Sequence, residues 1–244
     1  MSETFIGWVN ALLGEALTKP ENRLAAREAL RTFLSAEVEA RRSDPRDDLL
    51  TELIHMELDD PNADITDEVV VGVANLLLVA GIDTTWSSIG AALWHLATHP
   101  ADRERLVAEP DLLPTAVEEF LRFYSPVTMA RVAERDIEFG DVEFKTGDKI
   151  LMNFPAANHD PEHFDDPDEF IIDRERNRHV AFGSGIHRCA GSNLARLEMT
   201  TALRVWIERI PEFVLSDRSP MKWAGGQVRG PREMPLSFPA GSPR

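Results

Sequence analysis

The sequence predicts a mainly α-helical fold that carries small β-sheets. Helical periodicity of apolar residues recurs through most of the first half of the chain, whereas the candidate strands are few and short. The 244 residues are 43% hydrophobic and 28% charged, which is typical of a globular chain with a sizeable core. No internal repeat, low-complexity tract or linker interrupts them, so we expect one domain.

The predicted elements follow in order. Helices are expected over 2–17, 22–42, 46–57, 66–98, 101–108 and 112–124. Short strands are expected over 131–133, 137–139, 142–144 and 149–152, because apolar residues alternate there around Gly-Asp turns. A loop-rich stretch over 153–181 precedes a further helix, which the spacing of Leu194, Leu197, Leu203 and Trp206 predicts, and residues 221–230 resemble a hairpin.

The longest predicted helix contains an uncharged run from Val69 to Ile82. This run is too short to span a membrane and predicts a helix that is buried on all sides. Gly81 and Asp83 are unfavourable within such a helix. Thr84 could bond back to the carbonyl of Ala80, bend the helix and open a groove beside Gly81, where Asp83 could relay protons. A capped kink or a solvent-facing turn is the alternative interpretation.

Cys189 is the only cysteine, so an intramolecular disulfide and any cage of several thiolates are excluded. It lies in a glycine-rich loop after Phe182 and just before a predicted helix, whose N-terminal N–H groups favour a thiolate. A thiolate in such a loop is suited to be an axial haem ligand. The alternatives are a buried structural thiol and a nucleophile activated by His187.

Two motifs carry a resemblance to the cytochrome P-450 family of haem-thiolate monooxygenases. The family signature F-x-x-G-x-x-x-C-x-G is matched by Phe182, Gly185, Cys189 and Gly191, and the oxygen-activation motif [AG]-G-x-[DE]-T is matched from Ala80 to Thr84. The resemblance implies that Cys189 ligates haem iron and that Asp83 and Thr84 deliver protons. Its other implied haem contacts are Ala80, Gly81, Phe182 and Gly183.

A third family motif, E-x-x-R, is matched by Glu119 and Arg122, which share one helix face. Alone, the pair is typical of an exposed salt bridge. The resemblance implies instead a structural pair that a further arginine joins, and Arg174 stands at the expected place.

The resemblance also implies contacts around the haem. Its propionates need charge-assisted donors, for which Arg131 and His187 are the candidates. Val127 and Val228 are expected to line the substrate pocket together with Ala80 and Gly81. The remaining histidines are interpreted otherwise: His95 and His99 have a metal-like spacing without a third ligand, and the surface is expected for His55, His159, His163 and His179.

The net charge of −16 argues against nucleic acid and anionic membranes as partners. In the segment around Cys189 basic residues predominate, so the local charge is positive. This basic patch is expected to dock an acidic ferredoxin or flavodoxin electron donor. Its candidate members are Arg174, Arg176, Arg178, His179, Arg188 and Arg196. Pairing of these residues with nearby acids is the alternative.

The resemblance covers only the C-terminal part of the family's chains. It implies the cytochrome P-450 fold with the N-terminal part absent, so that residues 1–244 form a single partial domain. The N-terminus lacks the pattern of a signal peptide, which predicts a cytoplasmic protein. The predicted function is haem-dependent insertion of one oxygen atom of O2 into a small apolar organic substrate. The alternative is a truncated, non-catalytic haem-binding or interaction fragment.

Overall fold

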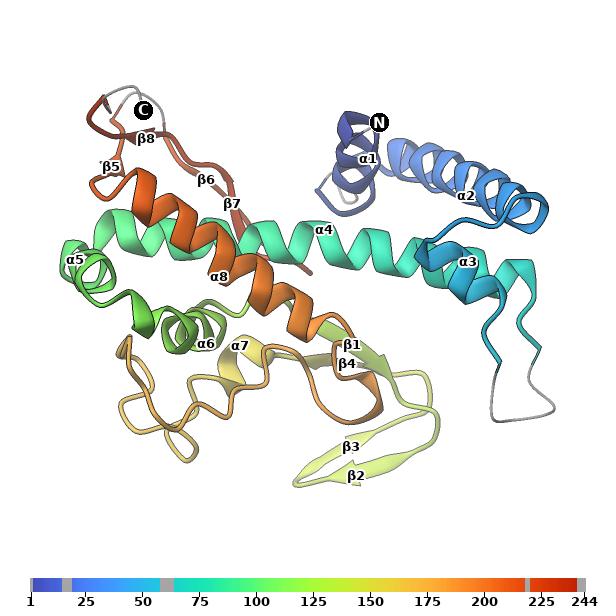
Figure 1. Cartoon of the computed structure of the whole chain (residues 1–244). Helices are drawn as coiled ribbons and strands as arrows, with labels where there is room; N and C mark the ends of the chain where they lie inside the picture. Colours follow the sequence, from blue (N-terminus) through green and yellow to red (C-terminus); the bar gives the residue numbers. More distant parts are fainter. Residues whose placement is uncertain (1, 15–18, 58–63, 218–219, 241–244) are drawn as a thin grey trace. The chain divides into compact units, whose positions relative to one another are not determined.

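The computed structural model describes residues 2–14, 19–57, 64–217 and 220–240 (Figure 1). The chain divides into two compact units, Met1–Asp83 and Thr84–Arg244, and helix α4 (Asp67–Thr98) runs through the boundary between them. The expectation of a single partial domain stays a prediction.

The first unit is helical. It contains α1 (Ser2–Val9), the π-helical turn η1 (Asn10–Gly14), α2 (Pro20–Ser43), α3 (Leu49–Ile54) and the first half of α4. Asp48 caps α3, because its Oδ1 accepts a hydrogen bond from the Thr51 N–H at 3.0 Å. The predicted helix 2–17 changes to π geometry at Asn10, and its residues 15–17 lie outside the described part of the chain.

The expectation that Val69 to Ile82 is buried on all sides is wrong. One face of this part of α4 packs on α2, where Ala74 joins Leu30 and Leu34 in a buried cluster. Leu76 and Leu77 are not members of that cluster and are 64% and 42% exposed. The helices of the first unit cover one face of α4 only, so its uniform apolarity does not produce uniform burial.

Helix α4 is also long and apolar enough to cross a membrane by length and composition alone. In the most apolar 18-residue window of this helix, 22% of the residues are buried. A core helix of a soluble protein can pass the same test, so this observation is weak evidence for a membrane span.

The second unit has a helical core. It contains the second half of α4, α5 (Pro100–Ala108), η2 (Pro110–Leu112), α6 (Leu113–Tyr124), α7 (Phe154–Ala157), η3 (Gly185–His187) and α8 (Ser192–Arg209). Helix α8 packs on α5 and α6 (Figure 1). Leu96, Phe120 and Leu203 bring α4, α6 and α8 into one buried apolar cluster.

Small antiparallel sheets surround this core, as the strand pattern predicts. Strand β1 (Met129–Val132) pairs with β4 (Lys149–Met152), and β2 (Ile137–Phe139) pairs with β3 (Val142–Phe144). The C-terminal hairpin is confirmed as β6 (Lys222–Ala224) with β7 (Gly230–Glu233), although its second strand extends beyond residue 230. The pair β5 (Val214–Leu215) and β8 (Leu236–Ser237) was not predicted, because two-residue strands leave no alternating pattern.

Candidate haem-thiolate site

Cys189 lies on an exposed loop that the backbone holds closed. The Cys189 N–H donates to the Phe182 carbonyl at 2.8 Å, and the Arg188 N–H donates to the Gly185 carbonyl at 3.1 Å. Gly183 and Gly185 have φ angles of 70° and 66°, which favour glycine. The loop therefore needs glycine where the P-450 signature has Gly185.

Cys189 is exposed, and glycines flank it in the loop. A Cβ at Gly191 would lie 3.9 Å from Sγ, and a Cβ at Gly185 would meet no atom within 4 Å. Helix α8 begins at Ser192 with Gly191 as its N-cap residue, so Cys189 lies just before a helix N-terminus, as predicted. An exposed thiol on a fixed loop with open surroundings fits the axial ligand of a flat macrocycle.

Glu118 and Arg196 form an ion pair beside Phe182, at the start of this loop. The Arg196 guanidinium donates to both Glu118 oxygens, at 2.6 and 3.0 Å, and lies 4.6 Å from the centroid of the Phe182 ring. The pKa of Arg196 is raised, first by its hydrogen bond to Glu118 and to a smaller extent by the charge of Cys189. Arg196 thus links α6 and α8 to the start of the cysteine loop.

His179 belongs to the same network, so the expectation that it is a surface residue is wrong. Its side chain is 3% exposed, its Nδ1 accepts from the Ala181 N–H, and its Nε2 donates to Glu118 at 3.0 Å. Burial opposes ionisation of Glu118, but the hydrogen bonds from His179 and Arg196 outweigh it and lower the pKa of Glu118 to about 2. Sequence reasoning missed Glu118, whose only signal is its position beside Glu119.

Glu119, Arg122 and Arg174 meet in the interior of the second unit. Both oxygens of Glu119 accept from Arg122 at 2.8 Å, and Arg174 Nε lies 3.1 Å from Oε2. The Ile171 N–H and the Asn177 amide complete the coordination of the carboxylate at 2.9 and 3.0 Å. Glu119 and Arg122 are fully buried, so their pair is not the exposed salt bridge that the isolated motif would suggest.

The two arginines also hold the loop-rich stretch that follows the small sheets. All five N–H groups of Arg122 are used: three bonds reach the backbone carbonyls of Asn158, Pro167 and Glu169, and two reach Glu119. Arg174 donates to the carbonyls of residues 165, 166 and 169. Side-chain donors therefore replace regular secondary structure as the partners of this backbone.

Asp83 and Thr84 occupy consecutive positions within an uninterrupted helix. Asp83 is 2% exposed, and the Thr84 carbonyl accepts from the Ser88 hydroxyl at 2.9 Å. A Cβ at Gly81 would meet no atom within 4 Å, so the backbone beside Gly81 and the exposed Ala80 is open.

The structure brings Val127 and Val228 together in an antiparallel β-bridge. Val228 is 7% exposed and Val127 is half-buried. Arg131, on β1, is also half-buried, and His187 is exposed in η3 beside the cysteine loop. Within the described residues, neither Arg131 nor His187 pairs with a carboxylate. No hydrogen bond joins His187 to Cys189 in this part of the chain either, so the structure does not support a nucleophilic cysteine that His187 activates.

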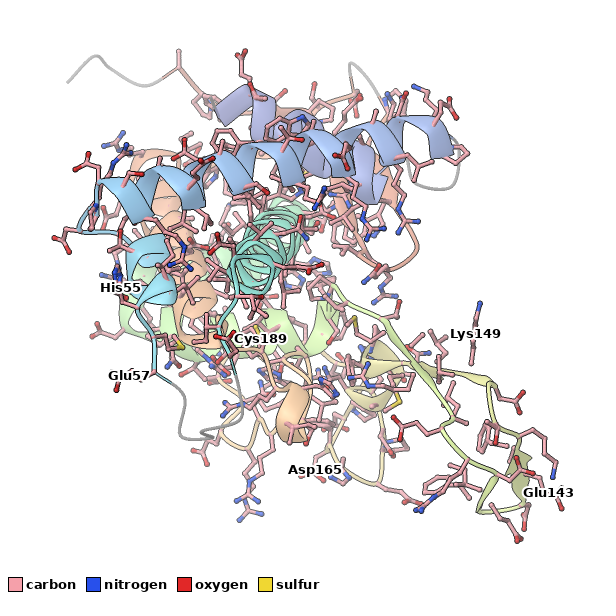
Figure 2. All side chains as sticks on the ribbon, turned by 90° about the vertical axis from the view of Figure 1, so that its right-hand side faces the viewer. His55, Glu57, Glu143, Lys149, Asp165 and Cys189 are labelled. Atoms are coloured by element: carbon pink, nitrogen blue, oxygen red, sulfur yellow. The ribbon has the colours of Figure 1, made fainter. Side chains whose placement is uncertain are left out.

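Only part of the predicted basic patch is at the surface. Arg176, Arg178 and Arg188 are exposed, whereas Arg174 is buried against Glu119 and Arg196 is paired with Glu118. Figure 2 labels Cys189 near the middle of the view, and Glu143, on strand β3, far from it. The β2–β3 hairpin, which carries Glu138 and Glu143, is therefore separate from the cysteine loop.

Comparisons with known proteins agree with this geometry. Residues 4–216 match the profile of the family described as Cytochrome P450. "Probable cytochrome P450 127A1" of Sinorhizobium fredii is 39% identical over 230 residues, which are 94% of this chain and 54% of the relative. "Steroid C26-monooxygenase" of Mycolicibacterium smegmatis is 38% identical over 86% of this chain and 53% of its own length.

Solved structures of cytochrome P450 proteins also superpose on this chain. The cytochrome P450 PksS of Bacillus subtilis superposes with a TM-score of 0.89 at 33% identity, covering 97% of this chain and 61% of that chain. CYP109E1 of Bacillus megaterium in complex with testosterone gives a TM-score of 0.85 at 33% identity, covering 96% and 64%. The chain thus spans little more than half the length of the curated relatives, and the predicted partial fold is confirmed.

Proposed function

Because the chain belongs to the cytochrome P450 family, we propose that it carries the haem-thiolate site of a monooxygenase. The reaction is R–H + O2 + two electrons + two protons → R–OH + H2O. The observation that supports it best is the exposed Cys189 thiol on a loop that hydrogen bonds and positive-φ glycines hold in place. When bound, haem supplies the activation of O2.

Cys189 would hold the iron through its thiolate. The hydrogen bond to the Phe182 carbonyl keeps the cysteine backbone fixed, and Arg196, which lies over the Phe182 ring, interacts electrostatically with Cys189. Phe182 and Gly183 would pack near the macrocycle, since glycine there leaves room for a flat group.

Arg131 and His187 would bind the haem propionates. Both side chains can donate hydrogen bonds and neither has a carboxylate partner among the described residues. Hydrogen bonds from a guanidinium to a carboxylate are charge-assisted and strong. Arg131 Nη1 already donates to the Ala130 carbonyl at 2.9 Å, which leaves its other N–H groups for a propionate.

Asp83 and Thr84 would manage the two protons that the reaction consumes. The buried Asp83 carboxyl group would take up a proton from solvent, and the Thr84 hydroxyl would pass it toward the reacting oxygen. Ala80 and Gly81 would leave space for that oxygen beside α4, because neither carries a large side chain.

Val127, Val228, Ala80 and Gly81 would line a pocket for a small apolar organic substrate. They present only aliphatic carbon or backbone, which favours an apolar molecule. The names of the relatives agree with this class, since they include a steroid C26-monooxygenase and a vitamin D(3) 25-hydroxylase.

A ferredoxin- or flavodoxin-type protein would supply the electrons. The exposed Arg176, Arg178 and Arg188 lie in the chain segment around Cys189 and suit an acidic donor. Reversing Arg178 and Arg188 to Glu would slow donor-driven reduction at low salt. We also propose that the protein is cytoplasmic.

Two measurements test the proposal. Titration of the protein with haem is expected to give one bound haem per chain, and Cys189→Ala is expected to weaken this binding strongly. Turnover under ¹⁸O2 is then expected to place one ¹⁸O atom in the product, with Asp83→Asn slowing turnover while haem binding persists. Haem binding without any turnover would favour the non-catalytic fragment, and no haem binding would refute the site.

A further inference from the structure

A groove lies between α5, the segment after α8, and β8. Its volume is about 590 Å³. None of its lining residues belongs to the cysteine loop, the buried Glu119 cluster or the candidate substrate pocket. Its lining includes Arg103, Glu104, Val107, Glu212, Phe213 and Val214.

Arg103 is the unusual member of this lining. It is 8% exposed, and its Nη1 donates to the carbonyls of Leu96 and Phe213 at 3.0 and 2.9 Å. Its Nε is buried without a hydrogen-bond partner, its Nη2 forms no hydrogen bond to the described residues, and no described carboxylate pairs with it. Nη2 is not among the buried atoms that lack a partner, so it is the donor of this guanidinium that an acceptor in the groove can reach.

The rim of the groove determines which acceptor fits. Glu104 and Glu212 are exposed and form no ion pair within the described part of the chain. Together with Arg103 they give the groove a side-chain charge of −1 (one cation and two anions). A free anion would be repelled by this charge, whereas a neutral carbonyl beside a basic group satisfies both Arg103 and the two carboxylates.

The walls add apolar contact area and include residues of the strand pair β5–β8. Val107 and Val214 are 43% and 52% exposed, and the Phe213 ring lies under the Arg103 guanidinium at 5.5 Å. Val214 of β5 and Ser237 of β8 line the groove, and among the described residues these two strands pair only with each other. The edge of such a strand pair can add an extended peptide.

We propose that this groove binds an extended basic and apolar peptide segment of a partner protein. A peptide carbonyl accepts from Arg103 Nη2, and a Lys or Arg side chain pairs with Glu104 and Glu212. An aliphatic side chain packs on Val107 and Val214. The chain's net charge of −16 draws a basic partner toward it. The inference is independent of the haem site.

The probe is a fluorescently labelled peptide in which Lys and Val alternate, and its matched control is a peptide in which Glu and Val alternate. The test variant is Glu104→Lys with Glu212→Lys. The control variant, Glu138→Lys with Glu162→Lys, changes the net charge equally at exposed residues outside the groove. Circular dichroism checks that both variants fold.

Fluorescence anisotropy is expected to show binding of the Lys-Val peptide only. The groove variant should bind it about tenfold more weakly than the wild-type protein, whereas the control variant should bind nearly as well as the wild type. Val107→Ser, which leaves every charge in place, should also weaken binding several-fold. Equal weakening in both charge variants, equal affinity for the two peptides or no binding at all would overturn the proposal.

Discussion

Arg174 and Glu119, 55 residues apart in the sequence, lie with Nε 3.1 Å from Oε2 in the interior of the protein. The contact joins α6 to the loop-rich stretch before the cysteine loop. Since Arg122 and Arg174 also bond to backbone carbonyls over residues 158–169, one buried carboxylate anchors a segment that has little regular structure of its own.

Glu119→Gln is expected to lower the free energy of unfolding by about 3 to 5 kcal/mol, because it leaves two buried guanidinium groups without a counter-charge. Urea denaturation measures this change. The exposed Glu109→Gln is the control and should change stability by less than about 0.5 kcal/mol. A similar small effect at Glu119 would contradict the structural role of the cluster.

Glu118→Gln is expected to destabilise the protein by about 2 kcal/mol at neutral pH, because the hydrogen bonds from Arg196 and His179 lose their charge assistance. The folded-state pKa of Glu118 is about 2 against an ordinary 4.5, so this stabilisation is complete above 4.5 and disappears as the pH falls toward 2. The stabilities of the two proteins should therefore converge in acid. A difference that does not depend on pH would contradict the account.

His95 is expected to make the protein less stable in mild acid. Burial lowers its pKa to about 4 from 6.5, although its Nε2 lies 2.7 Å from Asp102. Between these pH values the unfolded chain binds a proton that the folded chain does not, so the free energy of unfolding falls as the pH falls, by about 3 kcal/mol in total. His95→Gln should flatten this part of the pH profile in urea denaturation, and the exposed His55→Gln should not.

Gly230→Ala is expected to destabilise the second unit. The new Cβ would lie 2.6 Å from the Ser87 Cβ and 3.0 Å from the Ser87 Cα, so α4 and β7 would have to separate. Overpacking of this kind costs about 1 to 3 kcal/mol. Gly225→Ala is the matched control, since its Cβ meets nothing within 4 Å. Thermal unfolding that is equal for the two variants would contradict the close packing.

The sequence was sufficient for the local features of the site. The glycine pattern predicted a tight loop at Cys189, and apolar spacing predicted α8 directly after it. The contact between Glu118 and Arg196 could not be predicted from the sequence, because 78 residues separate them and neither belongs to a local pattern. The exposure of Leu76 could not be predicted either, because an apolar run in the sequence does not show which other helices pack against it.

The absorption spectrum of the reduced, carbon monoxide-bound protein tests the central claim most directly. Residues 1–244 would be expressed with haem supplied, beside Cys189→Ala prepared in the same way. The account predicts a Soret band with the strong red shift of thiolate-ligated haem, and loss of this band in Cys189→Ala. A band typical of histidine ligation, or the same spectrum from both proteins, would contradict the assignment of Cys189 as the iron ligand.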